Sequence, residues 1–285
     1  MNCTICTHPG TKPKYNLPYS ILFECGHCKT QFLSPQPTEH RLTEIYSRDY
    51  YTSWGVNNQG FDLVRKMKYQ TATSYLKKIK KIKPEGKLLD IGCAFGFFLE
   101  AARDEGFEPF GIEFSKFSSD YAKKNISNDH VHCGTIENSP FPNQYFDVIT
   151  MFDLIEHTRQ PIVTFQTSVA RLKQDGLIVI TTPDTGSWSN KLLGKKWLHY
   201  KEEHLFYFNR KSLNVIAAKA GLQIVHTESC KKTFNLNYVF TQFAIYKLPV
   251  ISRMFKGLAK IIPDSWQHKT FGFAIGELLV ILKKE

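Results

Sequence analysis

The sequence predicts an α/β fold with a central sheet of seven mostly parallel strands, helices on both faces of the sheet, and a small N-terminal module. Two observations carry this prediction. Short apolar runs alternate with amphipathic stretches from about residue 61 onward, and four of the seven cysteines are spaced C-x2-C-x18-C-x2-C at the start of the chain. The 285 residues, of which 42% are hydrophobic, suffice for one large core and one accessory module.

The N-terminal cysteines have the spacing of a metal site. Cys3 and Cys6 form the knuckle "CTIC", and Cys25 and Cys28 form the knuckle "CGHC". Two such knuckles can supply four thiolates to a tetrahedral Zn²⁺, whereas a redox dithiol needs one CxxC at a strand-to-helix junction. We therefore predict a structural zinc ribbon at residues 1–35, with a closed metal site and no catalytic role.

A helical connector is predicted at residues 36–85. Its main helix, at 61–83, ends at "KPEG", and the stretch "YLKKIKKIK" places four apolar side chains, the last being Ile82, on one side and lysines on the other. The net charge of +11 would suit nucleic acid, anionic lipid or phosphorylated substrates. We favour the simpler interpretation, an amphipathic helix with a solvated lysine face.

The sheet is predicted from strands and helices that alternate between residues 86 and 230. The apolar strands are expected at 87–92, 107–115, 130–135, 146–153 and 176–183, and the helices at 95–106, 117–125 and 160–173. Such alternation is typical of right-handed βαβ units in an open, Rossmann-like sheet. Ligands of these sheets lie beyond the carboxyl ends of the strands, which is where the first turn falls.

The turn after the first strand argues against two classes of ligand. In "LLDIGCAFGFFLEAA" an acid closes the strand and the next glycines are Gly92 and Gly96, which gives D-x-G-x-x-x-G. A dinucleotide fingerprint requires G-x-G-x-x-G, and a P-loop requires a lysine that this turn lacks. The pattern therefore disfavours both NAD and phosphate binding of the P-loop kind.

This turn resembles motif I of the class I S-adenosylmethionine-dependent methyltransferases. The resemblance implies that Gly92, Cys93 and Gly96 leave room for the methionine moiety of the cofactor. It also implies that Asp90, which closes the strand, orients that moiety. Ala94 stands where the family usually has its middle glycine.

Later segments agree with the same family across residues 86–230. Glu113 ends "FGIE" and would by resemblance accept the ribose hydroxyls of the cofactor, although its spacing from the turn would suit NAD equally. "CGTIENSPF" looks like the adenine segment of the family, and "YFDVITMFDLIEH" looks like its fourth-strand motif. The further cofactor contacts that the resemblance implies are Phe114, Thr135, Ile136, Phe152, Asp153 and Leu154.

Two further segments indicate the acceptor. The N-terminal cysteine region resembles the zinc-binding region attached to methyltransferases that modify sugars, polysaccharide precursors or secondary metabolites. The segment 183–211, "PDTGSWSNKLLGKKWLHYKEEHLFYFNRK", resembles the matching insertion in these enzymes and in ubiquinone-pathway O-methyltransferases. We predict that it forms a substrate lid, with aromatic faces for stacking on a sugar ring and basic side chains for a diphosphate. The alternative for the aromatics is the core, where about half of Trp188, Trp197, Phe206, Tyr207 and Phe208 are expected.

Methyl transfer depends mainly on aligning the nucleophile with the methyl group. A hydroxyl acceptor would also benefit from a general base, for which histidine is suited. The candidates are His157, just after the fourth strand, and His204 in the lid; for His157 a structural role at a helix start is equally open. A divalent ion on Glu156 and His157, suggested by the ubiquinone-pathway resemblance, is the weaker alternative because few other ligands lie nearby in the sequence.

The C-terminal segment, residues 231–285, predicts a lid and the last strand. Its run "FAIYKLPVISRMFKGLAKII" is both apolar and basic and would alternatively suit a helix lying on an anionic bilayer. The sequence has no apolar stretch long enough to span a membrane and no readable secretory signal. We therefore expect a cytoplasmic protein, with peripheral membrane contact as the alternative.

Together these features predict an S-adenosylmethionine-dependent methyltransferase that acts at oxygen, nitrogen or carbon of a small or carrier-linked acceptor, such as a nucleotide-linked or lipid-linked sugar. A tRNA or rRNA methyltransferase is one alternative, but the fourth strand ends in "FDLI" and not in an N-P-P-Y type signature, so nucleic acid is not the expected partner. A non-catalytic zinc-ribbon adaptor is the other, and the retained Asp90, Gly92, Gly96 and Glu113 argue against it.

Overall fold

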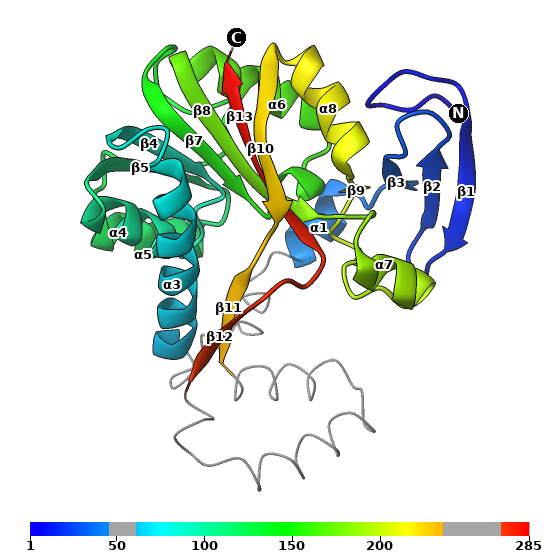
Figure 1. Cartoon of the computed structure of the whole chain (residues 1–285), viewed down its shortest axis with the longest axis horizontal. Coiled ribbons are helices and arrows are strands. Elements are labelled where there is room, and N and C mark those ends of the chain that lie inside the picture. The colour runs from blue at the N-terminus through cyan, green and yellow to red at the C-terminus, as the bar shows by residue number, and fades with distance from the viewer. Residues whose placement is uncertain (46–60, 236–268, 285) are drawn as a thin grey trace, which may run out of the picture.

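The computed structural model describes residues 1–45, 61–235 and 269–284. Its central sheet contains β4 (Gly86–Ile91), β5 (Phe107–Glu113), β6 (Val131–Cys133), β7 (Phe146–Phe152), β8 (Leu172–Pro183), β10 (Leu222–Ser229) and β13 (Glu277–Lys284). The order is β10-β13-β8-β7-β4-β5-β6 (Figure 1). β13 is antiparallel to both of its neighbours, and the remaining pairs are parallel. The predicted fold class is confirmed.

Helices cover both faces of this sheet. One face carries α3 (Phe61–Ile79), α4 (Phe97–Asp104) and α5 (Lys116–Asn125), and the other carries α6 (Pro161–Arg171) and α8 (Arg210–Lys219). In β8, Leu177 and Val179 belong to the core on the α3 side, whereas Ile178 and Ile180 belong to the core on the α6 side. Because both faces are covered, the strand is a continuous apolar run, as in other buried parallel strands.

The predicted helix at 61–83 ends earlier in the structure. α3 ends at Ile79, and its buried side chains include Tyr75, Leu76 and Ile79, as the periodicity predicts. The expectation that Ile82 lies on the same buried side is wrong, because the chain has left the helix by then and this side chain is 45% exposed.

The N-terminal segment forms a second sheet that continues into the predicted substrate lid. Its strands are β1 (Thr11–Asn16), β2 (Ile21–Cys25), β3 (Gln31–Ser34) and β9 (Phe206–Tyr207), in that order, and α1 (Glu39–Ile45) follows β3. β3 and β9 pair antiparallel, and the amide of Leu33 donates to the carbonyl of Leu205 at 3.0 Å. This sheet therefore joins the first residues of the chain to the segment after β8 (Figure 1).

The segment 183–211 also contains α7 (Trp188–Leu193) and the short 3-10 helix η2 (Gly194–Lys196). About half of five aromatic side chains in this segment were expected in the core, and the structure buries four of them: Trp197, Phe206, Tyr207 and Phe208 are each at most 2% exposed. Phe206 and Phe208 belong to the same core as the α6 face of the central sheet, whereas Trp197 and Tyr207 pack with Leu22 and Leu33 in a separate core on the other face of the N-terminal sheet. Among these aromatics only Trp188 is exposed, at 66%.

The C-terminal part of the chain returns to the central sheet. A two-stranded ribbon of β11 (Lys232–Asn235) and β12 (Thr270–Phe273) precedes β13, which lies between β8 and β10. The basic, apolar run expected to form a lid or to contact a bilayer lies outside the described residues. None of the helices in the described ranges is long and apolar enough to cross a bilayer.

Candidate active site

The turn between β4 and α4 has a backbone that requires glycine. Gly92 has a φ of 81° and Gly96 a φ of 79°, both in the left-handed region. A Cβ atom at Gly92 would also lie 3.0 Å from Cδ1 of Leu154. The amides of Gly92 and Cys93 both donate to the carbonyl of Ile112, at 2.7 and 3.0 Å, which fixes the turn to the end of β5.

Glu113, the last residue of β5, closes one side of this turn. Its carboxylate accepts hydrogen bonds from the amide of Ala94 at 2.9 Å and from the amide of Ser115 at 2.8 Å. These two bonds tie the turn to the end of β5, at the position where the resemblance places the ribose hydroxyls. The side chain that the resemblance assigns to the ribose therefore also shapes the loop assigned to the methionine moiety.

Asp90 lies under the same turn, at the end of β4. The side chain is 4% exposed and accepts a hydrogen bond from the Thr150 hydroxyl at 2.6 Å. Burial raises the pKa of Asp90 to about 7, and the nearby charge of Glu113 adds to the shift. The carboxyl is therefore much easier to protonate than an ordinary aspartate.

The other cofactor contacts implied by resemblance differ in their surroundings. Ile136 is buried in the core, and the ring of Phe152 packs edge-on against Phe98 with centroids 4.8 Å apart. Thr135 is half-buried, whereas Phe114 is 63% exposed. Phe114 therefore presents a surface to solvent, while Ile136 and Phe152 contribute packing.

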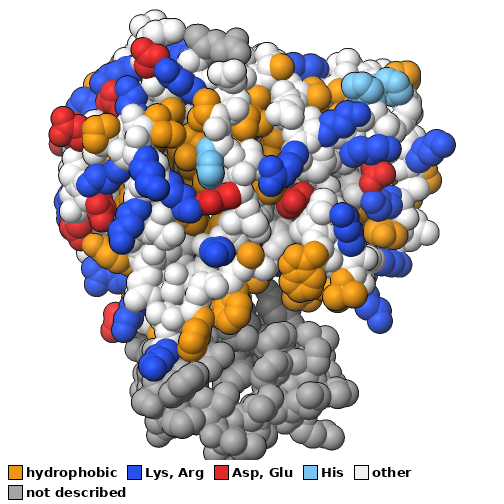
Figure 2. Space-filling view, in the orientation of Figure 1, with side chains coloured by type: hydrophobic (Ala, Val, Ile, Leu, Met, Phe, Trp, Pro, Cys, Tyr) orange, Lys and Arg blue, Asp and Glu red, His pale blue; other side chains and the backbone are white. Residues whose placement is uncertain are grey.

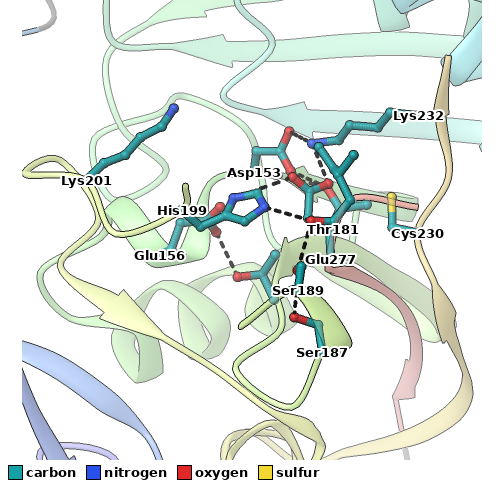
Figure 3. Close-up of polar contacts among 12 residues, drawn as sticks. Asp153, Glu156, Thr181, Ser187, Ser189, His199, Lys201, Cys230, Lys232 and Glu277 are labelled. Atoms are coloured by element: carbon teal, nitrogen blue, oxygen red, sulfur yellow. Dashed lines mark hydrogen bonds and ion pairs between the residues drawn. The ribbon is translucent and has the colours of Figure 1, made fainter. Parts of the chain in front are cut away.

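The side chain of Asp153 joins a polar cluster at the carboxyl ends of β7 and β8. Its carboxylate accepts hydrogen bonds from Thr181 at 2.8 Å and from Lys232 at 2.7 Å. The same Lys232 ammonium lies 2.6 Å from the Glu277 carboxylate. We call Asp153, Thr181, His199, Lys232 and Glu277 the strand-end cluster (Figure 3).

His199 brings the substrate-side segment into this cluster. Its Nδ1 is 3.9 Å from Oε1 of Glu277, and its Nε2 is 3.3 Å from the carbonyl of Ile275. Burial lowers the pKa of His199 to about 4, and the charge of Lys232 adds to the effect. The imidazole is therefore neutral at neutral pH.

The charges of the strand-end cluster compensate one another. Burial opposes ionisation of Lys232, but the carboxylates of Asp153 and Glu277 outweigh it, and the pKa of the lysine is well above its usual value. Burial also opposes ionisation of Asp153, but the charges of Lys232 and Lys68 outweigh it and lower the pKa. For Glu277 burial dominates and raises the pKa. The cluster therefore contains a stable ion pair between Lys232 and Asp153, and beside it the carboxyl of Glu277, which is easier to protonate than an ordinary glutamate.

Most of this cluster was not predicted. Of its members only Asp153 was assigned to the site from the sequence. Thr181 lies near the end of the apolar strand predicted at 176–183, and Lys232 and Glu277 come from two segments that meet only when β13 inserts beside β8. The signal that could have indicated them is a charged residue at the start or end of a buried strand, which is costly unless a partner is present.

The two histidine candidates lie together with Glu156. The 3-10 helix η1 (Ile155–His157) follows β7, and the rings of His157 and His204 meet edge-on with centroids 4.5 Å apart. Candidate ligand atoms of Glu156, His157 and His204 all lie within 4.8 Å of one another, so the third ligand missing from the sequence argument is supplied by the lid. The three groups could hold a metal ion.

Burial determines the protonation of this group. It lowers the pKa of His157 to about 4 and that of His204 well below its usual value, and it raises the pKa of Glu156 well above the usual value. Nδ1 of His157 lies 3.0 Å from the Glu203 carbonyl, while Nδ1 of His204 has no hydrogen-bond partner among the described residues. Both imidazoles are thus neutral and weakly basic, and whether either acts as a base stays a prediction.

The four N-terminal cysteines converge. The Sγ atoms of Cys3 and Cys28 are 3.7 Å apart, and those of Cys6 and Cys25 are 3.5 Å apart. All four sulfurs lie within 4.8 Å of one another, and none is in a disulfide. Tetrahedral Zn²⁺ with Zn–S distances of about 2.3 Å sets its sulfurs about 3.8 Å apart, so this arrangement fits the ion.

Comparisons with known proteins agree with this geometry. Among curated proteins, the chain is similar to the mitochondrial ubiquinone biosynthesis O-methyltransferase of Schizosaccharomyces pombe, with 31% identity over 104 residues, and to the ubiquinone biosynthesis O-methyltransferase of Bradyrhizobium diazoefficiens, with 29% over 100 residues. Each match covers 34% of this chain and only 37% and 39% of the relative, respectively. The substrates of these relatives therefore do not transfer directly.

Solved structures show the same fold. An S-adenosylmethionine-dependent methyltransferase of Thermotoga maritima superposes with a TM-score of 0.52 and 20% identity, covering 85% of this chain and 100% of that one. One from Archaeoglobus fulgidus gives 0.52 and 20%, covering 80% and 100%. At this identity the likeness supports the fold alone.

The methyltransferase domain family matches residues 45–227, a span that contains the glycine turn, Glu113, Asp153 and both histidine candidates. The prediction of an S-adenosylmethionine-dependent methyltransferase is thereby confirmed at the level of the family. The acceptor is not part of that finding. The chain belongs to the methyltransferase domain family.

Proposed function

We propose that the protein transfers the methyl group of S-adenosylmethionine to a hydroxyl oxygen of a small or carrier-linked acceptor, and that the acceptor is a sugar or polysaccharide precursor. The observation that carries this proposal is the position of the strand-end cluster, which follows β7 and β8 at the same sheet edge as the glycine turn and Glu113. When bound, the cofactor supplies an electrophilic methyl group on a sulfonium.

The residues of the turn support the cofactor half of this proposal. Glu113 offers acceptor positions to the ribose hydroxyls while it holds the amide of Ala94. Gly92 and Gly96 have positive φ angles, and a Cβ atom at either position would press on Leu154 or Ala122, so glycine lets the turn keep this tight shape. Because transfer gains most from alignment, a rigid loop of this kind supplies much of what catalysis requires.

The strand-end cluster supports a hydroxyl-rich acceptor. Two carboxylates, an ammonium and an imidazole offer both acceptors and donors within one small region, which matches a ring that carries several hydroxyl groups. The names of the curated relatives favour a second candidate, a phenolic acceptor of the ubiquinone-precursor kind. In either case His204 and His157 are the proposed proton acceptors, with alignment as the larger contribution because both are weak bases.

We also propose that Cys3, Cys6, Cys25 and Cys28 hold one structural Zn²⁺. The sulfur spacing supports it, because four cysteine sulfurs within 4.8 Å of one another fit tetrahedral coordination of one ion. Elemental analysis of the purified protein should give one zinc per chain. The cytoplasmic location stays a prediction.

Calorimetry with S-adenosylmethionine and its demethylated product tests the cofactor half. Glu113→Ala removes the ribose acceptor and leaves two backbone amides unpaired, so we expect the affinity to fall by about 10- to 100-fold, or about 1 to 3 kcal/mol. Glu108→Ala is the matched control, because Glu108 lies on the same strand but is exposed and pairs with Lys87. Equal affinities in the two variants, or a preference of the wild type for NAD, would exclude the assignment.

Mass spectrometry with a labelled methyl donor tests the acceptor. The wild type would be incubated separately with nucleotide sugars and with simple catechols. Label on a sugar hydroxyl supports the proposal, whereas label on the catechol alone would replace the sugar with a phenolic acceptor. The Glu113→Ala variant distinguishes true transfer from contamination, since its labelling should fall in parallel with its cofactor affinity.

A further inference from the structure

A patch of large apolar side chains is exposed on the outer surface of the segment that lines the strand-end cluster. Four such side chains lie within the eleven positions 188–198 of α7, η2 and the residues just after them. Their exposed fractions are 66% for Trp188, 74% for Leu192, 40% for Leu193 and 56% for Leu198. Hydrophobic side chains exposed this densely indicate a contact surface, whereas isolated ones are ordinary.

Lysines surround this patch, and acids are absent from its sequence. Residues 185–201 contain no aspartate or glutamate. Lys191, Lys195 and Lys196 are all exposed, and within the described parts of the chain none has a carboxylate within 4.0 Å. The region of α7 in Figure 2 shows hydrophobic side chains beside lysine and arginine side chains on the right of the described surface. The patch therefore combines apolar area with net positive charge, although the charge of Lys191 is partly offset by Asp184.

The opposite side of the same segment is fixed to the protein interior. The Trp197 indole donates to Oγ of Ser189 at 3.0 Å, and the Asn190 amide donates to the Tyr200 hydroxyl at 3.1 Å. Ser189 and Asn190 are buried. Because α7 cannot rotate without breaking these bonds, Trp188 and Leu192 stay on the outer surface.

We propose that the exposed side chains of residues 188–198, called the α7 patch, bind the surface of an anionic bilayer. Tryptophan is favourable at the headgroup level, leucines insert into the acyl boundary, and lysines are attracted to anionic headgroups. A second copy of this chain fits less well, because three lysines would face three lysines. The bilayer would lie beside the strand-end cluster, since His199 of that cluster directly follows the patch.

Co-sedimentation with lipid vesicles tests the proposal on the full-length protein. We expect binding to vesicles of phosphatidylcholine and phosphatidylglycerol, weak binding to phosphatidylcholine alone, and a loss of affinity as salt increases. Leu192→Glu should weaken binding by about 10-fold or more, since it removes an inserted apolar side chain and adds a repelled charge. Lys195→Gln and Lys196→Gln should each weaken binding by about 5-fold.

Val163→Glu is the matched control. Val163 on α6 is also exposed, at 41%, and the substitution makes the same change in charge. It should leave vesicle binding unchanged. Thermal unfolding and cofactor affinity of all variants confirm that they are folded, and vesicle binding requires no methyl transfer, so the result is independent of the proposed activity.

Three outcomes would overturn the inference. The wild type could fail to bind anionic vesicles. Leu192→Glu could bind as well as Val163→Glu, which would place the membrane contact elsewhere in the chain. Light scattering could instead show a dimer that Leu192→Glu dissociates while vesicle binding is absent, which would make a second copy of the chain the occupant of the patch.

Discussion

The glycine turn and the strand-end cluster lie at the same edge of the sheet, but they are held by different interactions. The turn lies within residues 90–115, and its shape comes from backbone amides that donate to the Ile112 carbonyl and the Glu113 carboxylate. The cluster joins side chains from β7, β8, the segment after α7, β11 and β13, and an ion pair holds its centre. The first is local in the chain, whereas the second depends on remote segments being correctly docked.

The proposed function assigns the cofactor to the first region and the acceptor to the second. A cofactor loop built from adjacent strands keeps its geometry when distant parts of the chain change. A cluster assembled from distant segments can vary with each of them, which suits the recognition of different acceptors on one fold. The following experiments should therefore disturb one region and leave the other intact.

The largest expected effect follows loss of the metal. Cys25→Ser removes one of the four proposed zinc ligands, and structural zinc contributes on the order of 10 kcal/mol to small modules of this kind. β3 pairs with β9, and the amide of Leu205 donates to the carbonyl of Glu156, so disorder in the ribbon should extend to the lid. In hydrogen exchange we expect the amide of Leu205 to lose protection, while those of Gly92 and Cys93 keep it.

Cys133→Ser is the control for this experiment, because Cys133 lies on β6, outside the four-cysteine group. It should retain zinc and the protection of Leu205. Protection at Leu205 that survives zinc loss would show that the lid does not depend on the ribbon. Global unfolding would show that the two regions are not separable.

A smaller effect is expected from the ion pair. Lys232→Met leaves the carboxylates of Asp153 and Glu277 facing each other in a partly buried site, which costs about 3 kcal/mol of unfolding free energy. Lys68 also interacts with this cluster and limits the loss. Urea denaturation should show the decrease, and calorimetry should show unchanged cofactor affinity.

Two further variants make this result specific. Lys173→Met breaks a more exposed pair with Asp147 and should cost less than about 1 kcal/mol. Adding Glu277→Gln to Lys232→Met removes one of the two facing negative charges and should restore part of the stability. If Lys232→Met behaved like Lys173→Met, the ion pair would not hold the cluster together.

The same contrast explains what the sequence could and could not predict. Asp90, Gly92, Gly96 and Glu113 lie in contiguous strand and turn patterns, so their shared location follows from local rules and strand order. Lys232 has no such pattern, because its partners become neighbours only through strand pairing far along the chain. The residue type alone also does not predict whether an aromatic side chain is buried. Trp197 is buried and Trp188 is exposed, and the difference depends on the orientation in which α7 is held.

The smallest expected effect concerns the protonation of Asp90. Its pKa rises from an ordinary value of 3.8 to about 7 in the folded protein, because burial and the charge of Glu113 outweigh the hydrogen bond from Thr150. The folded state therefore keeps a proton that the unfolded state has lost between about pH 4 and pH 7. The stability contributed by this protonation is full at about pH 4, decreases as the pH rises, and is lost above about pH 7.

Asp90→Asn keeps this position neutral at every pH, so the variant should lack that dependence. Between pH 5 and pH 8 the unfolding free energy of the wild type should fall by about 2 kcal/mol more than that of the variant. Urea denaturation at both pH values measures it, and comparison with the wild type cancels the histidines that titrate in the same range. If the difference stayed constant between the two pH values, Asp90 would already be ionised at pH 5. The glycine turn would then lie above a permanent negative charge. The strand-end cluster contains such a charge in Asp153, whose pKa, in spite of burial, is lowered by Lys232 and Lys68.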